Sequence, residues 1–140
     1  MKWKELRALG GIVIMIGNAG TASANVSLSG FQCYTLDRER LHISEEDYFH
    51  GRGLPPVFAS PEPGARKVGV EAGIVYVAWP LIKKNGYTEI LRANSELAWI
   101  QSDAVRPLRR ADGSVGGCTL SKGNGGRIIF TLEPGVGVRR

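Results

Sequence analysis

The chain has 140 residues, of which 43% are hydrophobic, 22% are charged and 19 are glycine, and its formal net charge is +5. This length suits one domain, because domains cluster near ~100–150 residues, and the hydrophobic fraction excludes a disordered chain. The glycine content is about twice the usual ~7% but lacks the every-third period of collagen. Two cysteines are too few for a miniprotein built from disulfides. These figures indicate a small, turn-rich globular domain.

The first 24 residues have the pattern of an export signal. A positive start with three basic residues is followed by an apolar stretch from Leu9 to Ile16 and by small residues at Ala22-Ser23-Ala24. The apolar stretch is about half of the ~20 residues that span a bilayer, which argues against an uncleaved membrane anchor. We expect cleavage between Ala24 and Asn25, a periplasmic or secreted mature protein, and no integral membrane segment after cleavage. The net charge then falls from +5 to +3, because three basic residues and one acid are removed.

Export affects the expected redox state of the two cysteines, Cys33 and Cys118, because both lie in the mature part of the chain. An oxidising compartment favours their pairing. The chain has no C-x-x-C motif, and only His42 and His50 are available to join a metal cluster. We therefore expect a structural disulfide, no metal site and no cofactor. The alternative is a pair of buried free thiols.

Residues 25–53 are predicted to form an N-terminal extension with a strand and one short helix. Apolar and polar residues alternate from Val26 to Ser29, a period of two that suits a strand, and Cys33, Tyr34 and Leu36 follow. Ser44 precedes three acids, which is typical of a helix start, because its hydroxyl caps free N–H groups and the acids suit the positive end of the helix dipole.

Residues 54–108 have a consistently β pattern. The β-branched and aromatic segment 74–81 is the strongest strand, and Asn85-Gly86 is a strong hairpin signal before a returning strand at 87–91. A further strand is expected at 97–101, then one 3₁₀ turn and a last short strand at 106–108. Short strands joined by tight turns predict an all-β fold with a small closed β-barrel.

Residues 109–140 are predicted to form a basic C-terminal hairpin and tail. Strands at 118–121 and 127–132 flank a glycine-rich tip at 122–126. A phosphate-binding P-loop requires a helix after its glycines, whereas here a strand follows. A Cys33–Cys118 disulfide would pin this hairpin and the N-terminal strand to the barrel.

Four pieces within residues 54–108 occur in a distinctive order. They are a strand and turn at 57–64, Val68-Gly69, a hairpin and strand at 85–90, and Trp99 within 98–105. Together they resemble a bacterial SH3-like domain, the kind found in exported and cell-wall proteins. In this resemblance Tyr87 takes the place of a tryptophan, and Ala104 stands where many members carry an aromatic groove residue.

The resemblance implies a ligand groove and a partner. It places Tyr87 and Trp99 at groove positions, with Phe58 as a candidate for the opposite wall and Trp79 as a further candidate. For each of these aromatics the alternative role is core or rim packing. The implied function is a non-catalytic binding protein that recognises a cell-wall peptide or an envelope protein.

Other functions have less support in the residues. No nucleophile, histidine base and acid form a recognisable triad, because both histidines adjoin the short helix and both cysteines are expected to be bridged, so no catalytic residue is predicted. Nucleic acid is not expected as a partner of an exported protein, and the sequence leaves the oligomeric state open. A periplasmic inhibitor or immunity-type protein that blocks an enzyme through a loop is the alternative function, and an unrecognised hydrolase is a third. Six basic residues indicate a solvated surface or a contact with an anionic polymer or lipid: Lys83, Lys84, Arg109, Arg110, Arg139 and Arg140.

Overall fold

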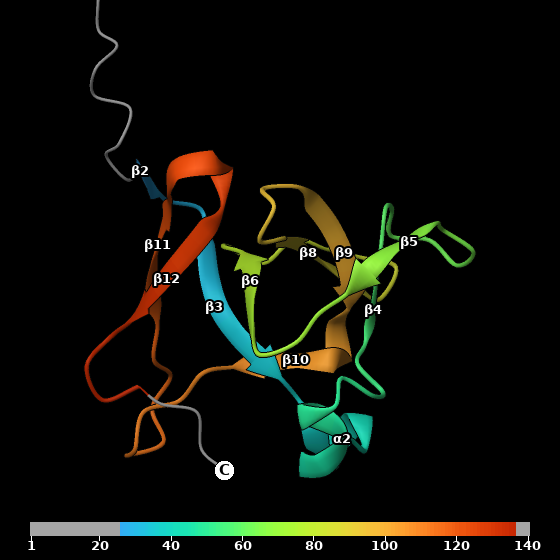
Figure 1. Cartoon of the computed structure of the whole chain (residues 1–140), viewed down its shortest axis with the longest axis horizontal. Coiled ribbons are helices and arrows are strands. Elements are labelled where there is room, and N and C mark those ends of the chain that lie inside the picture. Colours follow the sequence, from blue (N-terminus) through green and yellow to red (C-terminus); the bar gives the residue numbers. More distant parts are fainter. Residues whose placement is uncertain (1–25, 137–140) are drawn as a thin grey trace, which may run out of the picture.

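The computed structural model describes residues 26–136. The predicted export signal at residues 1–24, and Arg139 and Arg140 of the basic tail, lie outside the described residues. The described chain forms an all-β fold with short helices, as the sequence predicts (Figure 1). Between residues 26 and 136, no helix combines the length and apolar character needed to cross a membrane.

The larger of two sheets has eight strands, in the order β10-β3-β6-β8-β9-β4-β5, with β7 paired to β8. Neighbouring strands run antiparallel, and the sheet curves around a central core (Figure 1). A 3₁₀ turn at Ser102–Ala104 separates β9 from β10, close to where the sequence predicts one. The strands are β3 (Phe31–Leu36), β4 (Pro56–Phe58), β5 (Lys67–Val70), β6 (Ile74–Ala78), β7 (Lys83–Lys84), β8 (Tyr87–Leu91), β9 (Leu97–Gln101) and β10 (Val105–Pro107).

Strand β3 lies inside this sheet, between β10 and β6. Its register pairs Leu36 with Val105 and Phe31 with Ala78. The sheet therefore extends beyond residues 54–108, the range in which the sequence analysis placed the barrel. The physical reason is that β3 buries side chains on both faces, with Leu36 in one core and Cys33 in another.

Two apolar cores lie on opposite faces of the sheet, and β6 contributes to both. Val75 and Val77 pack into the core inside the curve, together with Val57, Ile90 and Ile100. Tyr76, which points to the other face, packs into a second core. This double burial explains why β6 is apolar throughout instead of alternating. The second core is formed by Cys33, Tyr76, Leu91, Leu108, Leu120 and Ile128.

A three-stranded sheet covers the second core. Its order is β12-β11-β2, with β2 at Val26–Leu28, β11 at Cys118–Lys122 and β12 at Ile128–Leu132, and the β11–β12 hairpin is as predicted. Figure 1 shows the hairpin beside β3. A disulfide joins Cys33 of β3 to Cys118 of β11, with 5.7 Å between the Cα atoms. The predicted disulfide is thus confirmed, and it fastens the two sheets together.

Two short helices connect β3 to β4. The predicted helix is α2 (Glu45–Phe49), in which the Ser44 side chain accepts a hydrogen bond from the N–H of Asp47. The other, α1 (Arg38–Leu41), begins at Asp37 and ends at a left-handed residue, His42, with φ 56°. Sequence analysis missed α1 because four residues are too few to show a helical period.

Candidate ligand groove

Three of the four predicted groove aromatics share the outer face of neighbouring strands. Val57, Thr88 and Ile100 point into the core, so the residues next to them, Phe58 on β4, Tyr87 on β8 and Trp99 on β9, point outward. The register pairs Phe58 directly with Trp99. The ring of Phe58 meets that of Tyr87 edge to face, with 5.8 Å between the centroids. We call Phe58, Tyr87 and Trp99 the aromatic cluster.

A hollow of about 440 Å³ adjoins the aromatic cluster at Tyr87. One wall is the loop between β4 and β5, and the opposite wall is the turn before β8 together with the 3₁₀ turn after β9. The lining residues are Pro63, Asn85, Gly86, Tyr87, Gln101, Ser102 and Asp103.

Hydrogen bonds hold the walls of this hollow in place. The Asn85 side chain donates to the carbonyl oxygen of Pro61 at 2.9 Å and so fastens the turn to the β4–β5 loop. The N–H of Ser102 donates to the carbonyl oxygen of Gly86 at 2.9 Å. The Ser102 hydroxyl shares a 2.6 Å hydrogen bond with the buried hydroxyl of Thr88. The hollow is therefore formed before any ligand arrives.

Acidic groups lie at both sides of the aromatic cluster. Asp103 is the one charged side chain in the lining of the hollow. Glu89 alternates with Tyr87 along β8, so it shares the outer face, and the register pairs it with Trp99. Lysines also adjoin the cluster, because the register pairs Lys67 with Phe58 and Lys84 with Tyr87, so charges of both signs flank it.

Trp79, the fourth predicted groove residue, does not line the hollow beside the aromatic cluster. Trp79 follows β6, and its N–H donates to the carbonyl oxygen of Gly30 at 2.8 Å, on the β3 side of β6. Strand β8, which carries Tyr87, lies on the other side of β6. The Trp79 side chain is 49% exposed, so it does not fill the core either.

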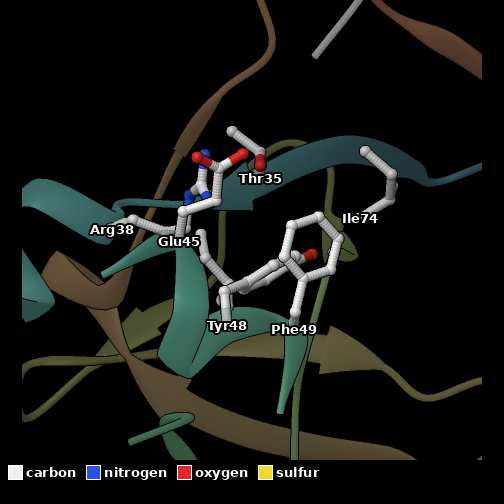
Figure 2. A pocket seen from close by; sticks show the side chains of 8 residues that line it. Thr35, Arg38, Glu45, Tyr48, Phe49 and Ile74 are labelled. Carbon is white, nitrogen blue, oxygen red and sulfur yellow. The ribbon is translucent and has the colours of Figure 1, made fainter. Parts of the chain in front are cut away.

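A smaller cavity of about 160 Å³ lies under α2 and was missed by sequence analysis (Figure 2). Figure 2 shows the rings of Tyr48 and Phe49 from the helix, with Ile74 across from them. The guanidinium of Arg38 stacks over the Tyr48 ring, 4.9 Å from its centroid. The full lining is Thr35, Leu36, Arg38, Glu45, Tyr48, Phe49, Gly73 and Ile74. Gly73 and Ile74 lie far along the chain from the other lining residues, so local sequence patterns do not indicate the cavity.

Three polar residues outside the two cavities contact groups of neighbouring elements or of their own helix: His50, Glu71 and Arg92. His50 contacts the carbonyl oxygen of Glu46 at 2.8 Å at the end of α2. Burial raises the pKa of Glu71, and the nearby positive charge of Arg92 opposes that shift. Arg92 also donates to the carbonyl oxygen of Val68 at 3.0 Å. Among residues 26–136, no three His, Cys, Asp or Glu side chains gather in a way that could hold a metal ion.

Comparisons with known proteins found no relative from which the function of the site could be inferred, so its geometry alone carries the interpretation. The chain matches no protein-family model, no curated protein and no solved structure. The feature that carries the functional argument is therefore the aromatic cluster beside the preformed hollow.

Proposed function

We propose that the protein is an exported, SH3-like, non-catalytic binding protein whose groove takes an extended peptide of the cell wall or of an envelope protein. One observation carries the proposal. Phe58, Tyr87 and Trp99 come from separate strands and meet on one outer face beside the hollow. Clustered aromatic side chains give a large, rigid contact area at a low entropic cost, which suits peptide recognition.

The positions of the resembling pieces support an SH3-like interpretation. Segment 57–64 holds the end of β4 and the loop that forms one wall of the hollow. Tyr87 opens β8 directly after a turn in which Asn85 and Gly86 both have positive φ. Trp99 lies at the centre of β9, and a 3₁₀ turn follows that strand. Three of the four pieces that carry the resemblance thus contribute residues to the aromatic cluster or to the lining of the hollow.

Export is supported by the disulfide and by the N-terminal pattern. Disulfides persist in oxidising compartments, such as the periplasm and the cell exterior. The Cys33–Cys118 bond is consistent with such a location. The proposed location is the cell envelope, where cell-wall peptides and envelope proteins are the available partners.

Co-sedimentation with purified peptidoglycan at graded salt tests the proposal. We expect retention that survives high salt and weakens about tenfold or more in Tyr87→Ala and in Trp99→Ala, because central aromatics of an interface each contribute ~1–2 kcal/mol or more. Trp79→Ala is the matched control. It removes an indole of greater exposure from another part of the surface and should leave retention unchanged.

Each other outcome has a distinct meaning. Retention that is insensitive to both Tyr87→Ala and Trp99→Ala refutes the groove. Retention that disappears with salt alone refutes it in favour of the basic surface, since exposed charges are screened by ions. No retention at all refutes the cell-wall ligand and directs the search to a protein partner, including an enzyme that the protein would inhibit.

A further inference from the structure

One edge strand of the smaller sheet is apolar and open. The order β12-β11-β2 leaves one side of β12 without a neighbouring strand. The strand reads Ile-Ile-Phe-Thr-Leu, without charge, proline or glycine, and Ile129 and Phe130 are 44% and 40% exposed. Natural proteins usually protect an edge with charged residues, proline or a bulge, because an open edge accepts another strand. The absence of such protection within β12 marks this edge as a pairing surface.

The hydrogen bonds at both ends of β12 define which backbone groups are free. At one end, the N–H of Gly123 donates to the carbonyl oxygen of Arg127. At the other end, the N–H of Glu133 donates to the carbonyl oxygen of Gly117, so Arg127 and Glu133 both direct their backbone groups toward the β11 side. In an antiparallel pair, every second residue bonds to the same neighbour. Ile129 and Thr131 therefore face β11, and the residues between them turn their N–H and C=O groups outward.

Only a few backbone N–H and C=O groups of β12 point away from β11, and this outward row is limited at each end. The N–H of Ile128 already donates to the carbonyl oxygen of Ala93 at 3.0 Å, which independently shows that this residue faces away from β11. Pro134, beyond the other end of the strand, has no N–H to donate. The N–H and C=O groups of Phe130 and Leu132 remain open.

We propose that this edge pairs with the same edge of a second copy, through an antiparallel two-fold contact centred on Thr131. Phe130 of each copy then lies opposite Leu132 of the other, so the N–H and C=O groups of both residues find partners. The two Thr131 side chains meet at the axis, a cross-strand pair that stabilises antiparallel sheets. The two three-stranded sheets become one continuous sheet.

The charges at the ends of β12 favour a second copy as the occupant. Arg127 and Glu133 flank the apolar strand on the same face, one at each end. Antiparallel pairing brings Arg127 of one copy diagonally opposite Glu133 of the other, and such neighbours are ~7–8 Å apart, within reach of long side chains. The Glu133 side chain is 45% exposed, although it already binds Arg110. Opposite charges therefore meet twice, and no like charges lie within the paired segment.

The turn after β12 is compatible with this register. The N–H of Val136 donates to the carbonyl oxygen of Glu133 at 3.1 Å, so the chain turns back just after the strand. The carbonyl oxygen of Ala93 already occupies the outward side of Ile128, so the paired segment is limited to Phe130–Leu132 of each copy. The contact therefore leaves no backbone donor unpaired at its ends.

Sedimentation velocity over a dilution series tests the contact. We expect a dimer that dissociates on dilution, and a rise of about tenfold or more in the dissociation constant of Thr131→Lys, since like charges directly opposite each other destabilise a sheet. Thr119→Lys is the matched control. Thr119 is exposed and is the register partner of Thr131 on β11, so its lysine lies one strand away from the axis and should leave the dimer intact. A wild-type protein that is monomeric at all concentrations, or a dimer unaffected by Thr131→Lys, overturns the proposal.

A cysteine pair tests the register separately and does not depend on how Thr131→Lys folds. Thr131→Cys places two thiols across the axis and should give a covalent dimer on non-reducing electrophoresis. Ile129→Cys places each thiol opposite Glu133 of the other copy and should give none. Efficient cross-linking at position 129, or its absence at 131, contradicts the two-fold pairing. Neither result bears on the groove, so this contact and the proposed function can fail independently.

Discussion

The disulfide is expected to be the largest single contribution to the stability of this fold. Cys33 is fully buried in the core between the two sheets, where its strand pairs with β6 at Tyr76. Cys118 begins β11, the central strand of the smaller sheet. Reduction releases the direct covalent link between the sheets, and only the apolar contacts of the second core then hold them together.

The magnitude follows from the length of the closed loop. The two cysteines are 85 residues apart. Closing a loop of this size removes chain entropy from the unfolded state that corresponds to about 4–5 kcal/mol. A domain of this size has a free energy of unfolding of about 5–15 kcal/mol, so reduction removes about a quarter of it or more.

Urea unfolding with and without reductant measures this contribution. We expect the free energy of unfolding to fall by about 4 kcal/mol on reduction, and Cys33→Ala/Cys118→Ala to show the same loss. The double variant is also the control for the reagent, because reductant should leave its unfolding curve unchanged. A loss below about 1 kcal/mol on reduction would refute the loop-entropy reasoning.

Two further predictions concern the contacts of Arg92. Burial raises the pKa of Glu71, so the folded state holds its proton more tightly than the unfolded state. The free energy of unfolding of the wild type, relative to that of Glu71→Gln, should therefore fall as pH rises from about 4 toward neutrality. Urea unfolding at each pH measures this difference, and a difference that rises with pH would contradict the prediction. A Cβ on Gly69 would collide with the Arg92 guanidinium, so Gly69→Ala should cost about 1–3 kcal/mol in thermal unfolding. Gly64→Ala, at another positive φ but in open space, is the matched control, and an equal cost in both variants would exclude the collision.

The elements that sequence analysis predicts are those defined by local chemistry. The Asn85-Gly86 turn is encoded by two residues that accept positive φ, and it sets the register of the strand after it. Ser44 marks the start of α2, because its side chain accepts a hydrogen bond from the N–H of Asp47, three residues further along the chain. Strand β3 was assigned to an extension because its place between β10 and β6 depends on pairings far along the chain.

The candidate site was predictable only in part, for the same reason. Phe58 and Trp99 meet because β4 pairs with β9, and this pairing came from the family resemblance and not from periodicity. Trp79 was grouped with them on its residue type, but β6 separates its Gly30 contact from β8. The open row on β12 depends on the contact between Ile128 and Ala93, which sequence does not reveal.

The most direct test of the groove uses the indole N–H signals in ¹H–¹⁵N NMR spectra. The chain has three tryptophans, and removal of the predicted signal leaves only Trp79 and Trp99. On titration with soluble cell-wall peptides, the account predicts that the indole signal of Trp99 shifts progressively while that of Trp79 stays in place. A shift of Trp79 alone, or of neither signal while the protein binds the peptide, would contradict it.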